Sequence, residues 1–294
     1  MVKCFVKENI FKDKRAEEPC LYYISKVTPK DNAYPRILHA HEDFVEIVLI
    51  RSGEAIFIID GKHYPVKAGD LVIYNSRIIH DELVEPGNNF SSLCCAVKGI
   101  VKKDLRINAL IGDDEMPILS SGKYYPTLNS LVSHMFQMLC LEYPGAQESC
   151  YYLLKAYLLQ IHHVINESYY LKTTEGYKEK DAQNSLANRI KDYIDKYYYE
   201  EISLKSISEE LNISLYYMAH VFKQVWGYSP KQYMIRRRIG EAQTLLIGTN
   251  LTITSIANRV GFSDSSHFNA LFAKNVGMPP RTYRKTYQNK EEEL

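Results

Sequence analysis

The last third of the chain contains an internal repeat. Residues 202–233 (ISLKSISEELNISLYYMAHVFKQVWGYSPKQY) match residues 251–283 (LTITSIANRVGFSDSSHFNALFAKNVGMPPRTY), and the extra residue of the second copy falls in a turn. A segment that recurs in this way is a supersecondary unit copied whole. Each copy predicts a short apolar helix, a polar turn and a second helix. The repeat therefore limits this part of the chain to an all-helical fold built from two like units.

In each copy the second helix is predicted to be amphipathic and to begin at a capping residue. Ser214 and Asp264 can accept hydrogen bonds from the amide protons that a helix start leaves without partners. The helix-turn-helix motif has this geometry, and its second helix enters the major groove of DNA. The polar faces carry Tyr216, Tyr217, Ala219, His220 and Lys223 in the first copy, and Ser265, Ser266, His267, Asn269 and Ala270 in the second.

A continuous helix over about Pro230–Gly248 is predicted between the two units, with Arg236, Arg237 and Arg238 in its middle. A rigid helix would fix the separation of the two recognition helices, which must be ~34 Å to read successive turns of one DNA face. An ordinary helical bundle is the alternative. A bundle needs neither a duplicated cap, turn and helix nor a local excess of positive charge.

Charge is distributed unevenly along the chain. Residues 186–290 contain 15 Lys and Arg against 8 Asp and Glu, whereas the net charge of the whole chain is only +1. A basic C-terminal domain beside a mildly acidic N-terminal one indicates a polyanionic partner for one end only. We therefore expect double-stranded DNA as that partner, with Lys223, Arg237 and Lys274 as candidates for phosphate contact.

The N-terminal region is predicted to be a β-sandwich or barrel over about residues 20–100. Short β-branched and aromatic runs alternate there with turns, and Asp60-Gly61 between two such runs is a strong hairpin signal. Over about residues 127–171 the apolar period becomes helical, and Tyr143–Gly145 divides this stretch into two antiparallel helices. Residues 172–185 are polar and predict a linker.

The two predicted helices each carry an apolar stripe that requires a partner. A homodimer would supply one, and packing of both stripes against the barrel of the same chain is the alternative. The six cysteines form no CxxC pair, and we expect them to be buried as small apolar residues in a reducing compartment. The charged N-terminus and the lack of an apolar run of ~18–20 residues predict a cytosolic protein without a membrane partner.

Four residues of the predicted barrel form a candidate ligand site: His39, His41, Glu46 and His80. Two residues apart on a strand, His39 and His41 face the same side. Glu46 lies at an odd offset and joins them only if residues 42–44 interrupt the alternation. Three imidazoles and one carboxylate suit Zn, Fe or Mn. The alternative is that these side chains contact an effector, or one another, without a metal.

The C-terminal third resembles the DNA-binding domain of the AraC/XylS (arabinose-regulator) family. The resemblance rests on a string of matching positions: Arg238, Ala242, Leu246, Ile256, Ala257, Val260, Gly261, Phe262, Asp264, Phe268, Phe272, Gly277, Pro280, Tyr283 and Arg284. It implies a transcriptional regulator without catalytic activity that recruits RNA polymerase. The residues it implies for DNA contact are Ser214, Tyr216, Tyr217, His220, Lys223, Arg237, Ser265, Ser266, His267, Asn269 and Lys274.

The sequence departs from this family at two positions of the recognition helices. The family often has Arg where this chain has His220 and Ala270. Neither residue can make the bidentate contact to guanine that is worth ~1–3 kcal/mol of base discrimination. The expected readout therefore depends on the remaining polar residues of these helices.

The N-terminal domain resembles the cupin barrel that this family often carries as its effector domain. The H-x-H-x4-E-x6-G spacing, formed by His39, His41, Glu46 and Gly53, together with the later His80, resembles the three-His, one-Glu site of metal-binding cupins. The sequence departs from that pattern because Ala33, Asn75 and Arg77 stand where metal cupins have an upstream Gly and a downstream PxG. The resemblance implies a small-molecule effector, a sugar being one candidate.

Together these features predict an α+β chain of two domains. Residues 1–171 would form a cupin-like effector and dimerisation domain, 172–185 a linker, and 186–294 a double helix-turn-helix domain with a linker helix. We expect a ligand-responsive, sequence-specific regulator of transcription, an activator by the resemblance. The alternatives are a metal-dependent cupin enzyme, an oxygenase or isomerase, and a metal or redox sensor, each fused to a DNA-binding domain.

Overall fold

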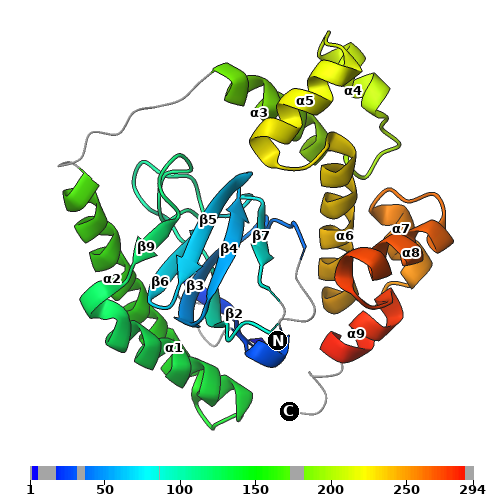
Figure 1. Cartoon of the computed structure of the whole chain (residues 1–294). Helices are drawn as coiled ribbons and strands as arrows, with labels where there is room; N and C mark the ends of the chain where they lie inside the picture. Colours follow the sequence, from blue (N-terminus) through cyan, green and yellow to red (C-terminus); the bar gives the residue numbers. More distant parts are fainter. Residues whose placement is uncertain (1, 6–17, 32–36, 86, 173–181, 289–294) are drawn as a thin grey trace.

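A computed structural model describes residues 2–5, 18–31, 37–85, 87–172 and 182–288 (Figure 1). These residues form an antiparallel β-sandwich, a pair of long helices against one side of it, and a helical C-terminal domain against the opposite side. The expected α+β architecture is confirmed. None of the helices in the described ranges combines the length and the apolarity needed to cross a lipid bilayer.

The sandwich consists of two antiparallel sheets. The larger sheet has the strand order β1-β2-β8-β3-β6-β9, and the smaller has the order β5-β4-β7. Two short 3-10 helices, Pro29–Asp31 and Gly122–Tyr124, lie outside the sheets. The strands are β1 (Val2–Phe5), β2 (Cys20–Val27), β3 (Val45–Ser52), β4 (Glu54–Ile59), β5 (Lys62–Lys67), β6 (Asp70–Tyr74), β7 (His80–Leu83), β8 (Ser91–Lys98) and β9 (Ile118–Ser120).

Strand β3 is covered on both faces, which explains its nearly continuous apolar sequence. Ile47 and Leu49 belong to the core between the larger sheet and the long helices. Val48 and Ile50 belong to the core between the two sheets. Because side chains alternate along a strand, Glu46 shares the inner side of β3 with Val48. The sequence of this strand thus places one carboxylate inside the sandwich.

The predicted hairpin at Asp60-Gly61 is confirmed. It joins β4 to β5, and both residues have positive φ, 46° and 76°. A two-residue turn with positive φ at both positions matches the right-handed twist of the flanking strands. Strand β5 lies at the edge of its sheet, which accommodates Pro65 because an edge strand does not need every amide proton for pairing.

Helices α1 (Tyr125–Cys140) and α2 (Ala146–Lys172) pack against the outer face of the larger sheet (Figure 1). Both predicted apolar stripes pack against this sheet, which is the alternative to a homodimer that the sequence left open. The stripes therefore give no support to the expected dimer. Seven stripe residues are buried in this core: Leu128, Val132, Met135, Leu154, Tyr157, Ile161 and Ile165.

The C-terminal domain consists of seven helices in the described residues. They are α3 (Ala182–Tyr197), α4 (Leu204–Glu210), α5 (Leu215–Trp226), α6 (Pro230–Gly248), α7 (Ile253–Arg259), α8 (Ser265–Val276) and α9 (Pro280–Gln288). Helix α6 has the predicted bounds. Helix α3 begins inside the predicted linker, of which residues 173–181 lie outside the described ranges.

The two repeated units have the same local construction. Each second helix, α5 or α8, ends at a left-handed glycine, Gly227 with φ 71° or Gly277 with φ 85°. The turn before each second helix also contains a left-handed residue, Asn212 in the first unit and Gly261 in the second. Asn and Gly are the residues that tolerate this conformation best. The repeat in the sequence is therefore a repeat of backbone geometry.

The cysteines depart in part from the expectation. Cys94, Cys95 and Cys150 are buried and free, as expected. Burial raises the pKa of the Cys150 thiol to about 11, so that it stays protonated near neutral pH. Cys140, at the end of α1, is disulfide-bonded, contrary to the prediction. The prediction relied on a reducing compartment, and the sequence spacing alone contained no sign of this pairing.

Truncation of Leu154 tests the core under α2. Leu154 is fully buried against the larger sheet, whereas Leu159 on the same helix is 54% exposed. We expect Leu154→Ala to lower the free energy of unfolding of the N-terminal domain by about 2–5 kcal/mol, because it leaves a cavity. The control Leu159→Ala should change it by less than about 0.5 kcal/mol. Urea denaturation followed by circular dichroism measures both, and equal effects would contradict the assigned packing.

Candidate nucleic-acid interface and buried histidine cluster

The polar faces of α5 and α8 are exposed, as a DNA-reading surface requires. Their capping residues act as predicted: Ser214 accepts a hydrogen bond from the amide of Tyr217, and Asp264 accepts one from the amide of Ser266. The apolar residues of both helices face the core of the domain, among them Met218 and Phe268, both fully buried. Each recognition helix is thus fixed on one side and free on the other.

In the first unit the exposed face is aromatic. Tyr216 is 83% exposed and Tyr217 is 48% exposed. The Tyr216 ring lies parallel to the imidazole of His220, one helical turn further on, with 6.4 Å between the ring centroids. Lys223 follows on the exposed surface. This face offers hydroxyl and imidazole groups for hydrogen bonds and one cation for phosphate.

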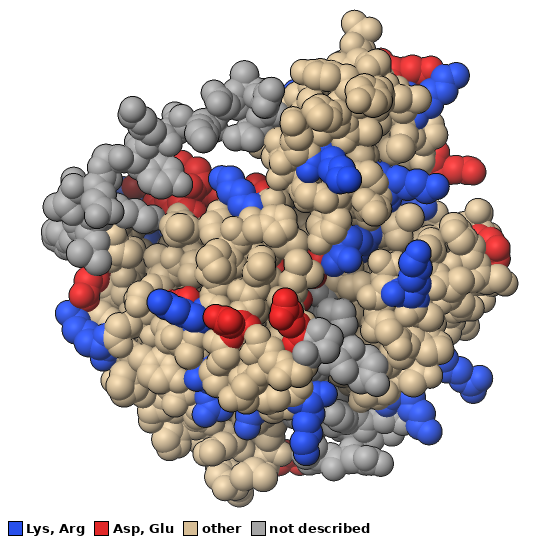
Figure 2. All heavy atoms as spheres, in the orientation of Figure 1, with Lys and Arg blue, Asp and Glu red and all other residues tan. Residues whose placement is uncertain are grey.

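In the second unit the exposed face is polar and smaller in side-chain volume. Ser266, His267, Asn269 and Lys274 are exposed, and Ser265 is half-buried at the start of the helix. On the face of the molecule shown in Figure 2, Lys and Arg outnumber Asp and Glu over the part where Figure 1 places α6 to α9. The basic character predicted for this domain therefore reaches its surface.

Arg237 differs from the expected phosphate contact. Its residue is only 6% exposed, and its Nε atom lies 3.5 Å from a carboxylate oxygen of Asp195 on α3. Its guanidinium also lies over the ring of Tyr198. The reason is that position 237 of α6 faces α3 rather than solvent. In this structure Arg237 therefore joins two helices and does not face the recognition surface.

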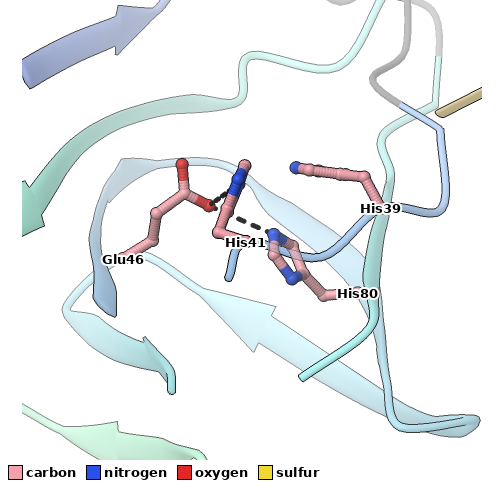
Figure 3. A group of neighbouring side chains, drawn as sticks. All are labelled: His39, His41, Glu46 and His80. Atoms are coloured by element: carbon pink, nitrogen blue, oxygen red, sulfur yellow. Dashed lines mark hydrogen bonds and ion pairs between the residues drawn. The ribbon is translucent and has the colours of Figure 1, made fainter. Parts of the chain in front are cut away.

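The predicted four-residue site is assembled inside the sandwich (Figure 3). His39, His41, Glu46 and His80 are all buried, and one possible ligand atom from each lies within 4.8 Å of the others. The chain bends at residues 42–44 before β3 begins at Val45. This bend is the interruption of strand alternation that the sequence required for Glu46 to join the histidines.

Glu46 is at the centre of the cluster. Its Oε2 atom lies 3.2 Å from Nε2 of His41 and 3.1 Å from Nε2 of His80. The hydroxyl of Tyr23 donates to its other oxygen, Oε1. The Glu46 carboxylate therefore has one oxygen held by a tyrosine and one directed at two imidazoles.

The second nitrogen of two imidazoles is occupied by backbone. Nδ1 of His39 lies 3.0 Å from the carbonyl oxygen of Ile37, and Nδ1 of His80 lies 2.9 Å from that of Ile78. A carbonyl only accepts, so each Nδ1 carries the proton and Nε2 of a neutral ring has a lone pair directed into the cluster. Metal-binding histidines in proteins are oriented by the same kind of contact.

His80 lies between two oxygen atoms. Its Nδ1 faces the carbonyl oxygen of Ile78 and its Nε2 faces the carboxyl group of Glu46. A proton shared between Nε2 and Glu46 satisfies both groups, and a positive ion between them would do the same. The donor set, three imidazoles and one carboxylate, suits Zn, Fe or Mn.

Aromatic rings enclose the cluster. Tyr74 stacks on the ring of His80 with 3.8 Å between centroids, and Phe44 stacks on His41 at 4.2 Å. Burial, and next the carboxylates of Glu82, Glu46 and Asp81, raise the pKa of Tyr74 well above its ordinary value. Tyr74 is therefore a neutral wall of the site.

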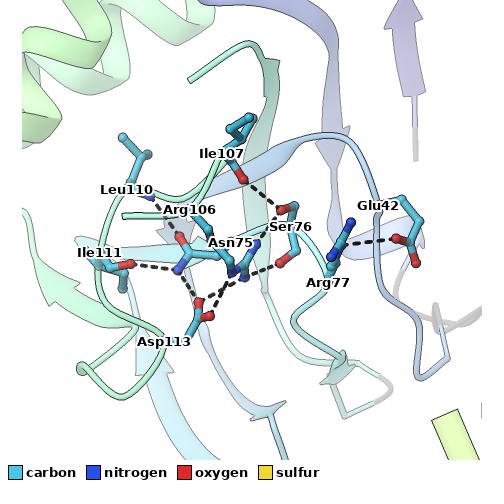
Figure 4. A network of polar contacts seen from close by, with 9 residues as sticks. All are labelled: Glu42, Asn75, Ser76, Arg77, Arg106, Ile107, Leu110, Ile111 and Asp113. Atoms are coloured by element: carbon cyan, nitrogen blue, oxygen red, sulfur yellow. Dashed lines mark hydrogen bonds and ion pairs between the residues drawn. The ribbon is translucent and has the colours of Figure 1, made fainter. Parts of the chain in front are cut away.

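A polar network stabilises the loop that follows β8 (Figure 4). The side-chain amide of Asn75 donates to the carbonyl oxygen of Ile111 and to the carboxylate of Asp113, each at 2.8 Å. Arg106 completes the network with a bond of 2.8 Å from Nε to Asp113. Burial alone would raise the pKa of Asp113, but the bonds from Arg106 and Asn75 and the guanidinium charge lower it.

This network explains one departure from the metal-cupin pattern. Asn75 stands at the first position of the expected PxG and anchors the loop through its side chain. Arg77 stands at the glycine position with φ 66°, so the left-handed turn is kept without glycine. The amide of Arg77 donates to the carbonyl oxygen of His41 at 2.6 Å. Arg77 therefore has a left-handed backbone and binds the segment that carries His41.

A small surface pocket lies beside the same loop. Tyr64, Asn75, Ile78 and Asp113 are among the residues that line it, and none of the four cluster residues does. This pocket is therefore separate from the buried cluster. The sequence predicted the buried cluster but not the pocket, because the loop at residues 111–117 carries no recognisable motif.

Two further arginines that match the family signature act structurally. Arg238 donates to the carbonyl oxygens of Tyr198 and Glu200 at 2.6 and 2.8 Å. Arg284 donates to those of Leu246 and Leu251 at 3.2 and 2.6 Å. These positions thus join helices to loops within the C-terminal domain.

Comparisons with known proteins agree with this division of the chain. Residues 207–286 match a family described as a helix-turn-helix domain, and residues 24–86 match a family described as a cupin domain. An uncharacterised HTH-type transcriptional regulator, YdiP of Escherichia coli (strain K12), is 28% identical over 251 residues, which cover 85% of this chain and 82% of that protein. The HTH-type transcriptional activator RhaS of Salmonella schwarzengrund (strain CVM19633) is 26% identical over 251 residues, which cover 83% of this chain and 86% of that protein.

Two solved structures are among those similar to this chain. The C-terminal domain of AraT, a response regulator from Geobacillus stearothermophilus, is 33% identical, covers 36% of this chain and 88% of its own, and has a TM-score of 0.35. Unsaturated fatty acid-bound ToxT from Vibrio cholerae is 14% identical and has a TM-score of 0.47. The match covers 90% of this chain and 95% of that one. The sequence relatives are named as transcriptional regulators, which is the class expected from the repeat.

Proposed function

Because the chain belongs to the AraC-type helix-turn-helix transcriptional regulators and carries a cupin domain, we propose that α5 and α8 both read one operator while the histidine cluster binds the regulatory ligand. The observation that carries the proposal is the duplicated unit with two exposed, capped recognition helices. Surface helices of any bundle expose their polar faces, but here the same cap, turn and exposed helix occur twice, at the two ends of one connecting helix.

The linker helix supports simultaneous reading by both units. Helix α6 has 19 residues, which corresponds to a length of ~28 Å at 1.5 Å per residue. Successive major grooves on one face of DNA are ~34 Å apart. A helix of this length, with one unit packed near each end (Figure 1), fits a site of two consecutive turns for one chain.

The exposed residues indicate how the two units differ in readout. Asn269 can pair with adenine through two hydrogen bonds, the geometry that asparagine uses in the major groove. Tyr216 and His220 offer single hydrogen bonds and ring contacts instead. We therefore assign the larger share of base discrimination to α8, and we assign Lys223 and Lys274 to phosphate contact.

For the cupin domain we propose a divalent metal, Zn, Fe or Mn, held by His39, His41, Glu46 and His80. When bound, the ion would take the place of a proton between Nε2 of His80 and the Glu46 carboxylate. A small-molecule effector, such as a sugar, would bind at the cluster or in the pocket beside residues 111–117. The role assigned to the metal is sensing, in keeping with the regulator class of the relatives.

Three further parts of the proposal concern the dimer, the contact with RNA polymerase and the place of action. A homodimer would use the outer face of α2, where Tyr152 and Leu159 are 56% and 54% exposed and lie seven residues apart on one side of the helix. Recruitment of RNA polymerase, and hence activation, would follow from the relative named as an activator. A regulator of this kind acts in the cytosol, where the chromosome is.

Substitutions on α8 and α5 test the DNA proposal in an experiment that also finds the operator. Selection from randomised duplexes by the full-length protein should yield a consensus that spans two helical turns. Asn269→Ala should remove the preference at one or two adjacent base pairs, at a cost of about 1–3 kcal/mol on the selected site. Electrophoretic mobility shifts on matched and mismatched duplexes measure this change.

Lys223→Ala is the matched control for that experiment. It should weaken binding to all duplexes alike and reduce the slope of log K against log salt by roughly 0.9. The proposal would be wrong if Asn269→Ala left the consensus unchanged, or if the selected consensus covered a single helical turn.

Metal analysis tests the proposed ligand of the cluster. Protein purified without an affinity tag and incubated with Zn²⁺, Mn²⁺ or Fe²⁺ should retain close to one ion per chain after dialysis, measured by mass spectrometry of the metal. His41→Ala should weaken binding at least as much as the ~10–100-fold caused by the loss of an outer-shell partner. His134→Ala, at an exposed histidine of α1, is the control, and equal loss in both variants would contradict the assigned site.

A further inference from the structure

The backbones of His39 and His80 are joined by a pair of hydrogen bonds. The His39 amide donates to the His80 carbonyl at 3.0 Å, and the His80 amide donates to the His39 carbonyl at 2.9 Å. Side chains alternate across extended chain, so the neighbours of these histidines face away from the cluster. Leu38 and Asp81 are two of those neighbours, and both contact helix α6.

Helix α6 packs closely on this outer side. A Cβ atom added to Gly240 would lie 2.0 Å from the carbonyl oxygen of Leu38. The amide of Ile37 donates to the side-chain oxygen of Gln243 at 2.9 Å. Ile37 and Leu38 also belong to the same apolar core as the helices of the C-terminal domain. The segment that carries His39 is therefore a docking surface for α6.

A buried ion pair completes the contact. Asp81, whose side chain is fully buried, pairs with Arg236 of α6, whose side chain is 19% exposed. The second carboxylate oxygen of Asp81 and Nε of Arg236 are buried, and neither has a hydrogen-bond partner among the residues described. The free-energy cost of removing such charges from water offsets much of the energy gained by pairing them. The ion pair therefore adds little net stability to the docked state, so the contact between the domains can open.

The β4–β5 hairpin makes a second contact with the C-terminal domain. A Cβ atom at Gly61 would lie 1.9 Å from the ring of Trp226 at the end of α5. Lys191 of α3 pairs with Asp60 of the same hairpin, with 2.9 Å between Nζ and Oδ1. Trp226 is the single tryptophan of the chain and is only 1% exposed. It therefore reports directly on whether the two domains are docked.

We propose that the His39–His80 bridge is a two-sided coupling element. Occupation of the histidine cluster on its inner side controls the docking of α6 on its outer side, and thereby holds or releases the DNA-binding domain. The inference rests on the proposed function only for the nature of the occupant. A ligand of the cluster shifts the docking equilibrium by its difference in affinity for the docked and undocked states, and docking shifts the ligand affinity by the same factor.

Two alanine substitutions in α6 test the docking half of the proposal. Gly240→Ala favours helix intrinsically but places a methyl group against the Leu38 carbonyl. Gly248→Ala, in the same helix, meets nothing within 4 Å. In the full-length protein we expect Gly240→Ala to shift Trp226 emission to longer wavelength and to increase its quenching by acrylamide, with Gly248→Ala like the wild type.

Asp81→Lys is a second variant that approaches the same contact from the cupin side, since it opposes Arg236 with a like charge. It should reproduce the emission shift of Gly240→Ala. Far-ultraviolet circular dichroism checks that all variants keep their helices. Buried-tryptophan emission in both Gly240→Ala and Asp81→Lys would overturn the proposal.

Zn²⁺ titration tests the coupling half. Isothermal calorimetry of the wild type, Gly240→Ala and Gly248→Ala should give a Zn²⁺ affinity that differs by ~5-fold or more in Gly240→Ala only, the lower range of typical coupling. Equal affinities in the three proteins would overturn the coupling. Absence of Zn²⁺ binding in all three would overturn both the proposed occupant and its coupling, while the Trp226 response would still decide whether the domains dock.

Discussion

Three consecutive arginines of α6 hold the C-terminal domain together and attach it to the cupin. Because a buried guanidinium requires partners, each of them fixes a different neighbour. Arg236 pairs with Asp81 of the sandwich, Arg237 faces Asp195 of α3, and Arg238 binds the carbonyls of Tyr198 and Glu200 beside the second unit. Burial raises the pKa of Asp195 even though Lys191 and Arg237 oppose this. Three consecutive arginines are a sequence typical of phosphate binding, but here they connect α6 to three different parts of the structure.

The position of the cupin indicates how regulation works in this chain. It contacts α3, the end of α5 and the middle of α6, while the polar faces of both recognition helices stay exposed. The sensor domain therefore does not cover the DNA-reading surface. Instead it packs against the end of α5 in the first unit and against the linker helix α6, to which the second unit is attached. Under the proposed coupling, this contact would act on the first unit and on α6 without covering the recognition helices.

The sequence predicted what depends on local patterns. The repeat indicated the two units, their caps and the bounds of α6, and the histidine spacing identified a cluster that the bend at residues 42–44 completes. What depends on contacts distant in sequence was less well predicted. The burial of Arg237 results from Asp195 of α3, about forty residues earlier in the chain. Packing of the helical stripes on the sandwich was an open alternative that the sequence did not decide. Gly240, a glycine inside a helix, was the one local sign of the docking contact.

The fit of Gly61 against Trp226 and of Gly240 against Leu38 has an evolutionary consequence. Each glycine belongs to one half of the chain, and the atoms that exclude a side chain there belong to the other half. At Gly61 the excluding atoms are those of the Trp226 ring, so a change at one of these two positions constrains the other. At Gly240 the excluding atom is a backbone carbonyl, so the constraint falls on Gly240 alone whatever residue stands at position 38. A chimera that grafts this sensor onto another DNA-binding half would therefore need a residue without a side chain at the helix position that faces Leu38.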